Sequence, residues 1–178
     1  EPHMNNRRIF QPRGKVVGGS SSLNGMVYVR GHARNFDDWE ESGATGWGYR
    51  DVLPYFRKLE TYLPGPDDYR GASGPIRVDR HSGQHPIEQA FIQAVAEAGY
   101  PVPVDYNGAD QEGATVFDAN IHKGERSGTA AVISSIRERS NLRVETRAHV
   151  TRILIRSGRA IGVEYVQNGQ TLEAHCDR

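Results

Sequence analysis

The chain has 178 residues, enough for one domain of ordinary size or two small ones with a buried core. Its 22 basic and 22 acidic residues cancel, so charge gives no reason to expect nucleic acid as a partner. The single cysteine, Cys176, excludes an intramolecular disulfide and a thiolate zinc site built from this chain alone, and it favours a reducing, cytoplasmic location. No apolar run approaches the roughly 20 residues that a membrane helix needs.

The first 31 residues are expected to form a loop rich in glycine and serine. Small residues over 14–22 are followed by an apolar stretch over 26–29. A flexible Gly/Ser linker would have no such apolar stretch. Glycines admit close backbone approach, and successive N–H groups can bind an anion, so a structural turn and a cofactor-contacting segment are equally good interpretations. The loop is not a P-loop, because Val16 follows Lys15, nor a nucleophile elbow, because Ser22 stands at the last glycine position.

Residues 32–140 are expected to be mainly helix and loop, with a short extended piece over 75–78 and a glycine- and aspartate-rich loop over 101–113. Apolar residues at helical spacing predict four helices. In chain order, the first is capped by Asn35 and ends at Glu41, the second runs from Asp51 to Tyr62 or Leu63, the third covers Pro86–Ala98 before Gly99, and the fourth follows Ser127.

From residue 141 the apolar period becomes two, which predicts strands. A short strand at 142–144 is expected first, and a three-stranded meander follows it. Ser157–Arg159 and Asn168–Gly169 supply the turns, and the second pair is a strong signal for a two-residue hairpin.

The seven histidines do not predict a metal site. His81 and His85 have i, i+4 spacing, but Gly83 and Pro86 place the pair in a loop rather than on a helix that would align both rings. His122, His149 and His175 lie beside or within predicted strands without a paired acid nearby in the sequence.

The loop and its surroundings resemble the first signature of the glucose-methanol-choline (GMC) flavin oxidoreductases, in residues 14–24, Arg30–Gly31 and Asp38–Trp39. The resemblance covers essentially the whole chain. Further segments agree in order, at 46–49, 53–60, 74–75, 105–108, 111–113 and 160–165. Residues 1–8 and 24–26 are most similar to the choline dehydrogenase branch of the family.

The resemblance implies an α/β fold, or α+β for this segment by itself: part of a Rossmann-like FAD-binding domain with a three-stranded meander. Residues 1–31 would be the flavin-contacting loop, 32–140 the mainly helical and loop segment, and 141–178 the strand and meander. The family's first βαβ unit, with its G-x-G-x-x-G motif, is expected before residue 1. Its substrate-domain sheet and catalytic histidine are expected after Arg178, so the segment alone should be inactive, with no catalytic residue and no metal ligand.

Cofactor contacts follow from the resemblance residue by residue. Gly18, Gly19 and Ser20 would approach the FAD pyrophosphate or ribityl chain. The run Asn24, Gly25, Met26 and Val27 would follow the flavin, and the backbone of Val150 would contact adenine. Leu23 stands where some family members have a histidine that links covalently to the flavin, so the FAD is expected to be non-covalent.

The implied reaction is oxidation of a small primary alcohol, most simply choline, with hydride transfer to flavin N5. The electron acceptor is not specified, and no nucleic acid or membrane span is expected in this segment. Two alternatives stay open: a GMC oxidase or dehydrogenase for another alcohol, and a non-catalytic product of a truncated gene. A cytoplasmic location is expected, with peripheral membrane association of the longer protein as the alternative.

Overall fold

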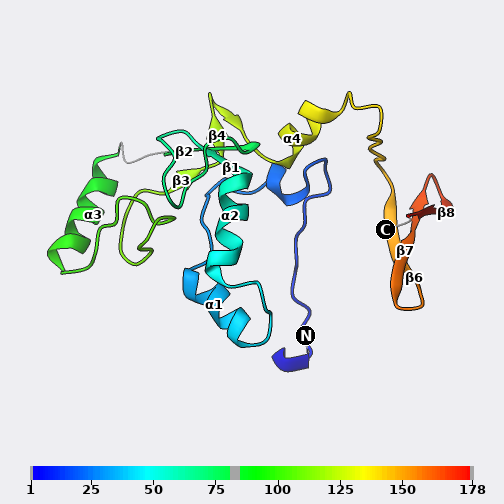
Figure 1. Ribbon diagram of the computed structural model, residues 1–178, viewed down its shortest axis with the longest axis horizontal. Helices are drawn as coiled ribbons and strands as arrows, with labels where there is room; N and C mark the ends of the chain where they lie inside the picture. Colours follow the sequence, from blue (N-terminus) through cyan, green and yellow to red (C-terminus); the bar gives the residue numbers. More distant parts are fainter. Residues whose placement is uncertain (1, 81–84, 177–178) are drawn as a thin grey trace. The chain divides into compact units, whose positions relative to one another are not determined.

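The structure is a computed structural model that describes residues 2–80 and 85–176 (Figure 1). It divides into two units, residues 1–135 and 136–178. The first unit contains all of the predicted flavin-contacting residues except Val150.

The first unit begins with two short 3-10 helices, η1 (Pro2–Met4) and η2 (Gly19–Ser22), before the helices α1 (Ala33–Glu41) and α2 (Tyr49–Leu59). The predicted cap of α1 is wrong by three residues: His32 is the N-cap, and its Nδ1 accepts a hydrogen bond from the N–H of Arg34. The histidine ring supplies the acceptor that the sequence analysis assigned to Asn35.

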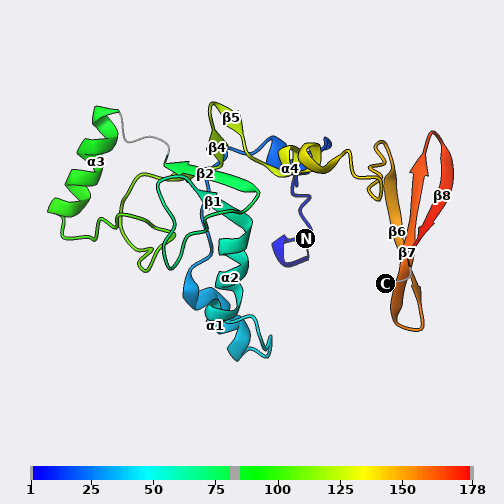
Figure 2. The same cartoon turned by 45° about the horizontal axis from the view of Figure 1, so that its top comes forward.

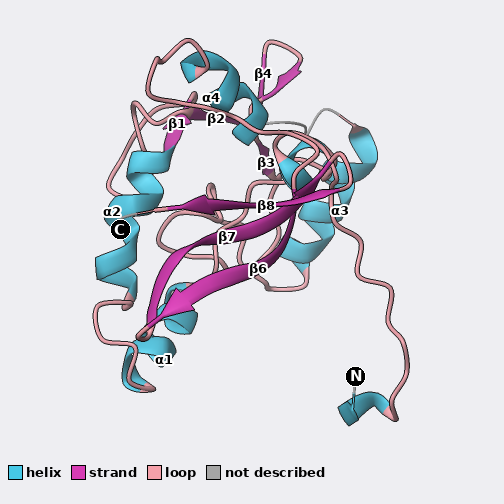
Figure 3. Cartoon of the chain, turned by 90° about the vertical axis from the view of Figure 1, so that its right-hand side faces the viewer, coloured by secondary structure: helices cyan, strands magenta, loops and turns pink. Residues whose placement is uncertain are grey.

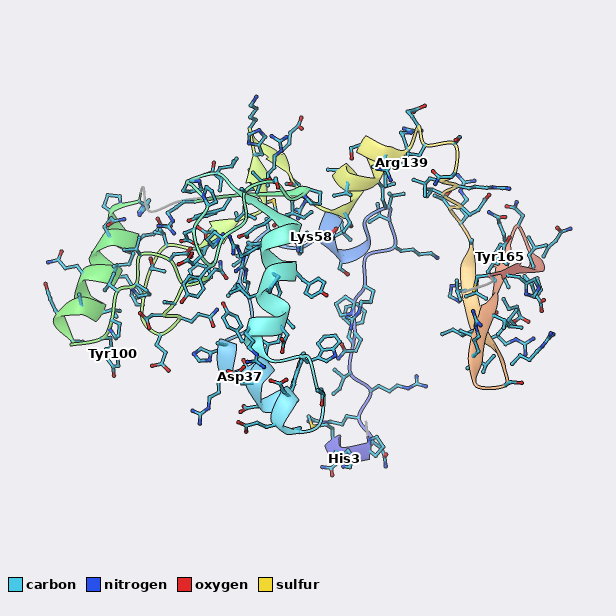
Figure 4. The ribbon with its side chains drawn as sticks, viewed as in Figure 1. His3, Asp37, Lys58, Tyr100, Arg139 and Tyr165 are labelled. Carbon is cyan, nitrogen blue, oxygen red and sulfur yellow. The ribbon has the colours of Figure 1, made fainter. Side chains whose placement is uncertain are left out.

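Helices α1 and α2 pack through a cluster of aromatic rings. The ring of Phe36 on α1 lies 5.6 Å from that of Phe56 on α2, centroid to centroid, in an edge-to-face arrangement. Asp37, labelled in Figure 4, accepts a hydrogen bond from the N–H of Tyr49 at 2.9 Å and so caps α2, whose own N-cap residue is Gly48. Two neighbouring helices in the sequence thus stabilise each other.

The predicted end of the second helix is wrong, because α2 stops at Leu59 and the next residues form the strand β1 (Glu60–Tyr62). Strand β1 pairs in parallel with β2 (Ile76–Arg80), with Glu60 opposite Ile76. Strand β2 pairs antiparallel with β3 (Asp118–Ala119), which completes a sheet of order β1-β2-β3. The buried apolar residues in the described part of the chain lie in this sheet: Tyr62, Ile76, Val78 and Ala119.

Helix α3 (Pro86–Glu97) confirms the predicted third helix, with Pro86 in its first turn and Gly99 at φ +85° just past its end. The loop predicted over 101–113 is confirmed as well. Figure 2 shows β4 (Ile121–His122) and β5 (Glu125–Arg126), a hairpin that the sequence analysis missed. Helix α4 (Thr129–Ile136) follows the hairpin and confirms the predicted fourth helix.

The second unit is an antiparallel meander of β6 (His149–Arg156), β7 (Arg159–Gln167) and β8 (Gln170–His175), drawn in magenta in Figure 3. The meander confirms the prediction, and Asn168 and Gly169 both take positive φ in the second turn, as a type I′ turn requires. The predicted strand at 142–144 is wrong: those residues pair with no strand in the described part of the chain. Apolar alternation alone does not form a strand when no partner edge is available.

The mixture of helices and strands confirms the α/β class expected from the sequence. None of the helices in residues 2–80 and 85–176 has the length and apolar character needed to cross a lipid bilayer.

Candidate functional site

The glycine- and serine-rich loop folds around η2 through hydrogen bonds between its own residues. Ser20 Oγ accepts from the N–H of Gly14 at 3.0 Å, and Ser22 Oγ donates to the carbonyl of Val17 at 2.8 Å. These hydroxyl groups therefore shape the loop, and the side chain of Ser20, a predicted cofactor contact, closes the loop onto Gly14.

The first turn of α4 holds the loop from the side of Gly18. Thr129 Oγ1 donates to the carbonyl of Gly18 at 3.1 Å and lies 2.7 Å from Ser21 Oγ. Gly18 has φ +88°, and a Cβ there would lie 2.4 Å from Ser22 Oγ and 3.0 Å from Ala130. The chain's own packing thus requires glycine at position 18.

Asn24 follows η2 and turns the chain toward Met26. Its Oδ1 accepts from the N–H of Met26 at 3.2 Å, which closes a turn of the Asx type. The same oxygen accepts a hydrogen bond of 2.6 Å from Nη1 of Arg126 on β5. The sequence analysis missed Arg126, because no local pattern links two residues so far apart in the chain.

Gly25 differs from Gly18, since nothing in the chain occupies the space that a side chain would take. No described heavy atom lies within 4 Å of a Cβ built at Gly25, and its φ is outside the positive region. Among the described residues, no partner accepts a hydrogen bond from the N–H of Gly25. The backbone of Gly25 is therefore exposed, as it is at several other glycines of the chain.

The next residues run along the edge of β3. Val27 forms an antiparallel bridge with Ala119, and the carbonyl of Met26 accepts from the N–H of Asn120 at 3.0 Å. Met26 itself has φ +65°, an uncommon conformation for a side chain other than glycine. The bonds on both sides of Met26 hold this conformation, which is a form of strain that occurs often at functional sites.

Tyr28 and Arg30 anchor the far end of the segment. The carbonyl of Tyr28 accepts from Tyr106 Oη at 2.7 Å and from Asn107 Nδ2 at 3.0 Å, while Asn107 Oδ1 accepts from the N–H of Arg30 at 2.8 Å. Asn107 is 1% exposed. Residues 24–30 are thus fixed by bonds from three other parts of the chain.

A buried ionic network lies under this segment, and the sequence analysis missed it. Its centre is Arg70, which is fully buried and donates from Nε to Glu60 Oε1 at 2.9 Å. Arg70 Nη1 donates to Asp118 at 2.8 Å and reaches both carboxylate oxygens of Asp105. The guanidinium also stacks 3.6 Å from the ring centroid of Tyr62.

Two further arginines balance the charge of the network. Arg30 Nη2 donates to Glu60 Oε1 at 2.6 Å, and Arg80 Nε donates to Asp118 Oδ1 at 3.2 Å. Three arginines and three carboxylates therefore meet, so that no net charge is buried. Because Arg30 belongs to both the loop segment and the network, the network connects the predicted flavin loop to the core sheet.

The surroundings raise several pKa values. Burial, reinforced by the charge of Glu60, raises the pKa of the Tyr28 phenol to about 12, and burial with Asp118 and Asp105 nearby raises that of Tyr62 to about 12. Burial by itself would lower the pKa of Arg70, but the hydrogen bonds to Asp118 and Glu60 outweigh it and raise that pKa. Both phenols stay neutral, and Arg70 stays charged, at physiological pH.

Four of the described histidines make structural contacts, and one of these is the pairing of His175 Nε2 with Glu173 Oε2 at 3.1 Å, an acid that the sequence analysis did not count. His32 and His85 cap α1 and α3, and His122 Nε2 lies 3.2 Å from Nη1 of Arg77, which can only donate. His81 lies outside the described residues, so the His81–His85 pair is not defined. Within the described part of the chain, no group of three or more His, Cys, Asp or Glu side chains could hold a metal ion.

The structure brings together the predicted contacts Gly18, Gly19, Ser20, Asn24, Gly25, Met26 and Val27 in one stretch of the first unit. Val150 belongs to the second unit, where it lies on β6 opposite Tyr165 and next to a break in the strand register. Val150 is 53% exposed.

Residues 2–176 match the family model described as GMC oxidoreductase. The chain is 46% identical over 179 residues to the mitochondrial choline dehydrogenase of Mus musculus, covering 100% of this chain and 30% of that protein. It is 47% identical over 171 residues to the oxygen-dependent choline dehydrogenase of Sinorhizobium fredii (strain NBRC 101917 / NGR234), covering 96% and 31%. The chain thus spans about a third of the length of the curated relatives it matches.

Solved structures resemble the chain over nearly its whole length. Pyridoxine 4-oxidase from Mesorbium loti matches with a TM-score of 0.84 and 32% identity, covering 93% of this chain and 33% of that one. An FAD-dependent oxidoreductase from Chaetomium thermophilum matches with a TM-score of 0.86 and 29% identity, covering 97% and 33%.

Proposed function

The chain belongs to the GMC oxidoreductase family, and we propose that the whole protein uses FAD to oxidise the CH–OH group of a small primary alcohol. The observation that carries this proposal is the match of residues 2–176 to the GMC oxidoreductase family model, and the exposed backbone at Gly25, in a loop held by hydrogen bonds on both sides, is consistent with it. A relative named FAD-dependent oxidoreductase, with 29% identity, supports the choice of cofactor.

The described residues fit this cofactor at the run Asn24–Val27. No described heavy atom lies within 4 Å of the Cβ position of Gly25, and its N–H has no hydrogen-bond partner among the described residues, so a planar ring could pack against this backbone. Gly18, Gly19 and Ser20 would hold the loop that follows the ribityl chain or pyrophosphate, and the backbone of Val150 would contact adenine. When bound, FAD supplies a two-electron acceptor for the hydride of the alcohol.

The residues of this chain would position the cofactor. The network around Arg70 holds Arg30, and the Asn120 N–H holds Met26, so the loop cannot collapse into the space that the ring would fill. The proton of the alcohol goes to a histidine that we place outside residues 1–178, since no histidine of this chain matches the catalytic one.

We propose that the FAD is non-covalent, because position 23 is leucine and a leucine side chain has no nucleophile to attach to the flavin. Leu23 is 68% exposed in the structure. Acid precipitation of the whole protein should release all of the flavin into the supernatant. Flavin retained in the washed protein pellet would contradict the proposal.

We propose choline as the substrate, from the names of the relatives that are 46–47% identical to the chain. The electron acceptor is left open, and the cytoplasmic location stays a prediction. Pyridoxine 4-oxidase, at 32% identity, keeps an alcohol other than choline as the second candidate.

The test is reduction of the bound flavin under anaerobic conditions. Choline should bleach the flavin absorbance of the whole protein, whereas tetramethylammonium should not, because it has the charged head group without the alcohol. Bleaching only by an aryl, aliphatic or polyethylene-glycol-type alcohol would favour the second candidate. A purified whole protein that binds no FAD would overturn the proposal and favour the non-catalytic interpretation.

A further inference from the structure

The orientation of the Asn24 amide is fixed by the two groups that contact it. Arg126 Nη1 and the N–H of Met26 can only donate, so the atom they both reach must be the carbonyl oxygen Oδ1. A carbonyl oxygen has two lone pairs, and both are occupied here. Asn24 can therefore offer a ligand only the two N–H bonds of Nδ2.

Arg126 is held in place by the base of its hairpin. The N–H of Ser127 donates to the carbonyl of Asn120 at 2.8 Å, and Asn120 Nδ2 donates back to the carbonyl of Ser127 at 2.8 Å. Asn120 is 8% exposed and also binds Met26 through its N–H. The same short hairpin thus fixes both groups that orient Asn24.

Arg126 also binds the loop before Asn24. Its Nη1 donates to the carbonyl of Ser21 at 3.1 Å as well as to Asn24 Oδ1 at 2.6 Å. One guanidinium therefore sets both the position of the loop and the direction of the amide. A hydrogen bond from a charged donor is stronger than a neutral one, which favours this single orientation.

We propose that Arg126 is a positioning residue that presents Asn24 as an obligate hydrogen-bond donor to an acceptor atom on the polar edge of the flavin ring. The inference rests on the proposed function, because it names the ligand of the same site. It extends that function by assigning a direction to the hydrogen bond and by assigning a role to a residue about one hundred positions away.

Asn24→Asp is the sharpest test of the donor role. The carboxylate keeps an acceptor for both Arg126 and Met26, so the loop and the melting temperature of the apoprotein should be preserved, but the donor is lost. We expect the dissociation constant of FAD in the whole protein to rise about 5- to 150-fold, the equivalent of one unsatisfied polar group. We also expect the reduction potential of the flavin to fall, because a negative charge replaces a donor. Unchanged FAD affinity and potential would overturn the donor assignment.

A double-mutant cycle tests the positioning role of Arg126. Arg126→Met should weaken FAD binding at least 5-fold when Asn24 is present. When Asn24 is already replaced by alanine, the effect should be at least 2-fold smaller, since only the bond to the carbonyl of Ser21 is then lost. Arg126→Lys, which keeps one charged donor, should recover part of the affinity. Additive effects of the two substitutions would overturn the role.

The matched control is Arg77→Met. Arg77 is an exposed arginine on β2 that contacts His122 and not the loop, so its replacement should leave FAD affinity and potential unchanged. If the wild-type protein itself bound no FAD, the proposed function would fail. If only the role of Arg126 and Asn24 were wrong, the wild-type protein would still bind FAD, so the two failures can be told apart.

Discussion

Replacing Arg70 with methionine should destabilise the protein severely, because it breaks the centre of the buried ionic network. Arg70 has no exposed surface, and it binds the fully buried carboxylates of Glu60 and Asp118. Methionine fills much of the space but leaves three carboxylates facing two arginines, so one negative charge stays buried without compensation. Breaking a buried ion pair in this way costs about 3 to 5 kcal/mol, and the lost stacking on Tyr62 adds to the cost.

The assay is denaturant unfolding of the whole protein, with two comparisons. Arg50→Met is the control, since the Arg50 side chain is 87% exposed and its ion pair with Asp51 spans 3.8 Å. This substitution should change the free energy of unfolding by less than about 0.5 kcal/mol. Adding Asp105→Asn to Arg70→Met restores charge balance and should recover part of the lost stability. A loss below about 1 kcal/mol for Arg70→Met, or no recovery in the double variant, would refute the charge-balance argument.

Three further predictions concern the loop and the pH dependence of stability. Gly25→Ala should weaken FAD binding but leave the melting temperature of the apoprotein unchanged. Gly18→Ala should lower that melting temperature even without FAD, because Gly18 has a positive φ and an added Cβ would meet Ser22 and Ala130. Equal changes in melting temperature for the two variants would contradict this contrast. Burial raises the pKa of Tyr28 to about 12, so as pH rises the unfolded chain loses the phenol proton of Tyr28 before the folded chain does. The free energy of unfolding should therefore decline between pH 10 and 12, and it should decline less steeply in Tyr28→Phe. Unfolding curves at several pH values measure this decline, and the same dependence on pH in both proteins would contradict the prediction. Hydrogen bonds from Thr151 and Arg152 lower the pKa of Glu164, so the Glu164 carboxylate stabilises the fold above pH 4.5, its ordinary pKa, and this stabilisation is lost as the pH falls below that value. Glu164→Gln should make the free energy of unfolding depend less on pH in this acidic range. An unaltered pH dependence would refute the assignment.

Elements with strong local signals could be predicted from the sequence. Helix α3 has proline in its first turn and glycine after its end, and the turn between β7 and β8 has the Asn168–Gly169 pair, so neighbouring residues were enough to place both. The assignment of the loop to flavin binding rests on its resemblance to a family and stays a prediction, since its glycines alone fit a structural turn equally well.

Features that depend on distant residues could not be predicted. Leu59, Tyr62 and Leu63 continue the helical period of α2, yet pairing with Ile76–Val78 makes Glu60–Tyr62 a strand and buries Glu60 against Arg30 and Arg70. Tertiary pairing overrides local periodicity there.

Hydrogen–deuterium exchange of the whole protein with and without FAD tests most directly whether the loop around Gly25 is the flavin site. The account predicts that FAD slows exchange over residues 18–27, most strongly at the N–H of Gly25, which has no partner among the described residues. Exchange in α3 should stay the same, since that helix is not part of the proposed site. Protection of α3 or any other element, with residues 18–27 exchanging as fast as in the apoprotein, would contradict the account.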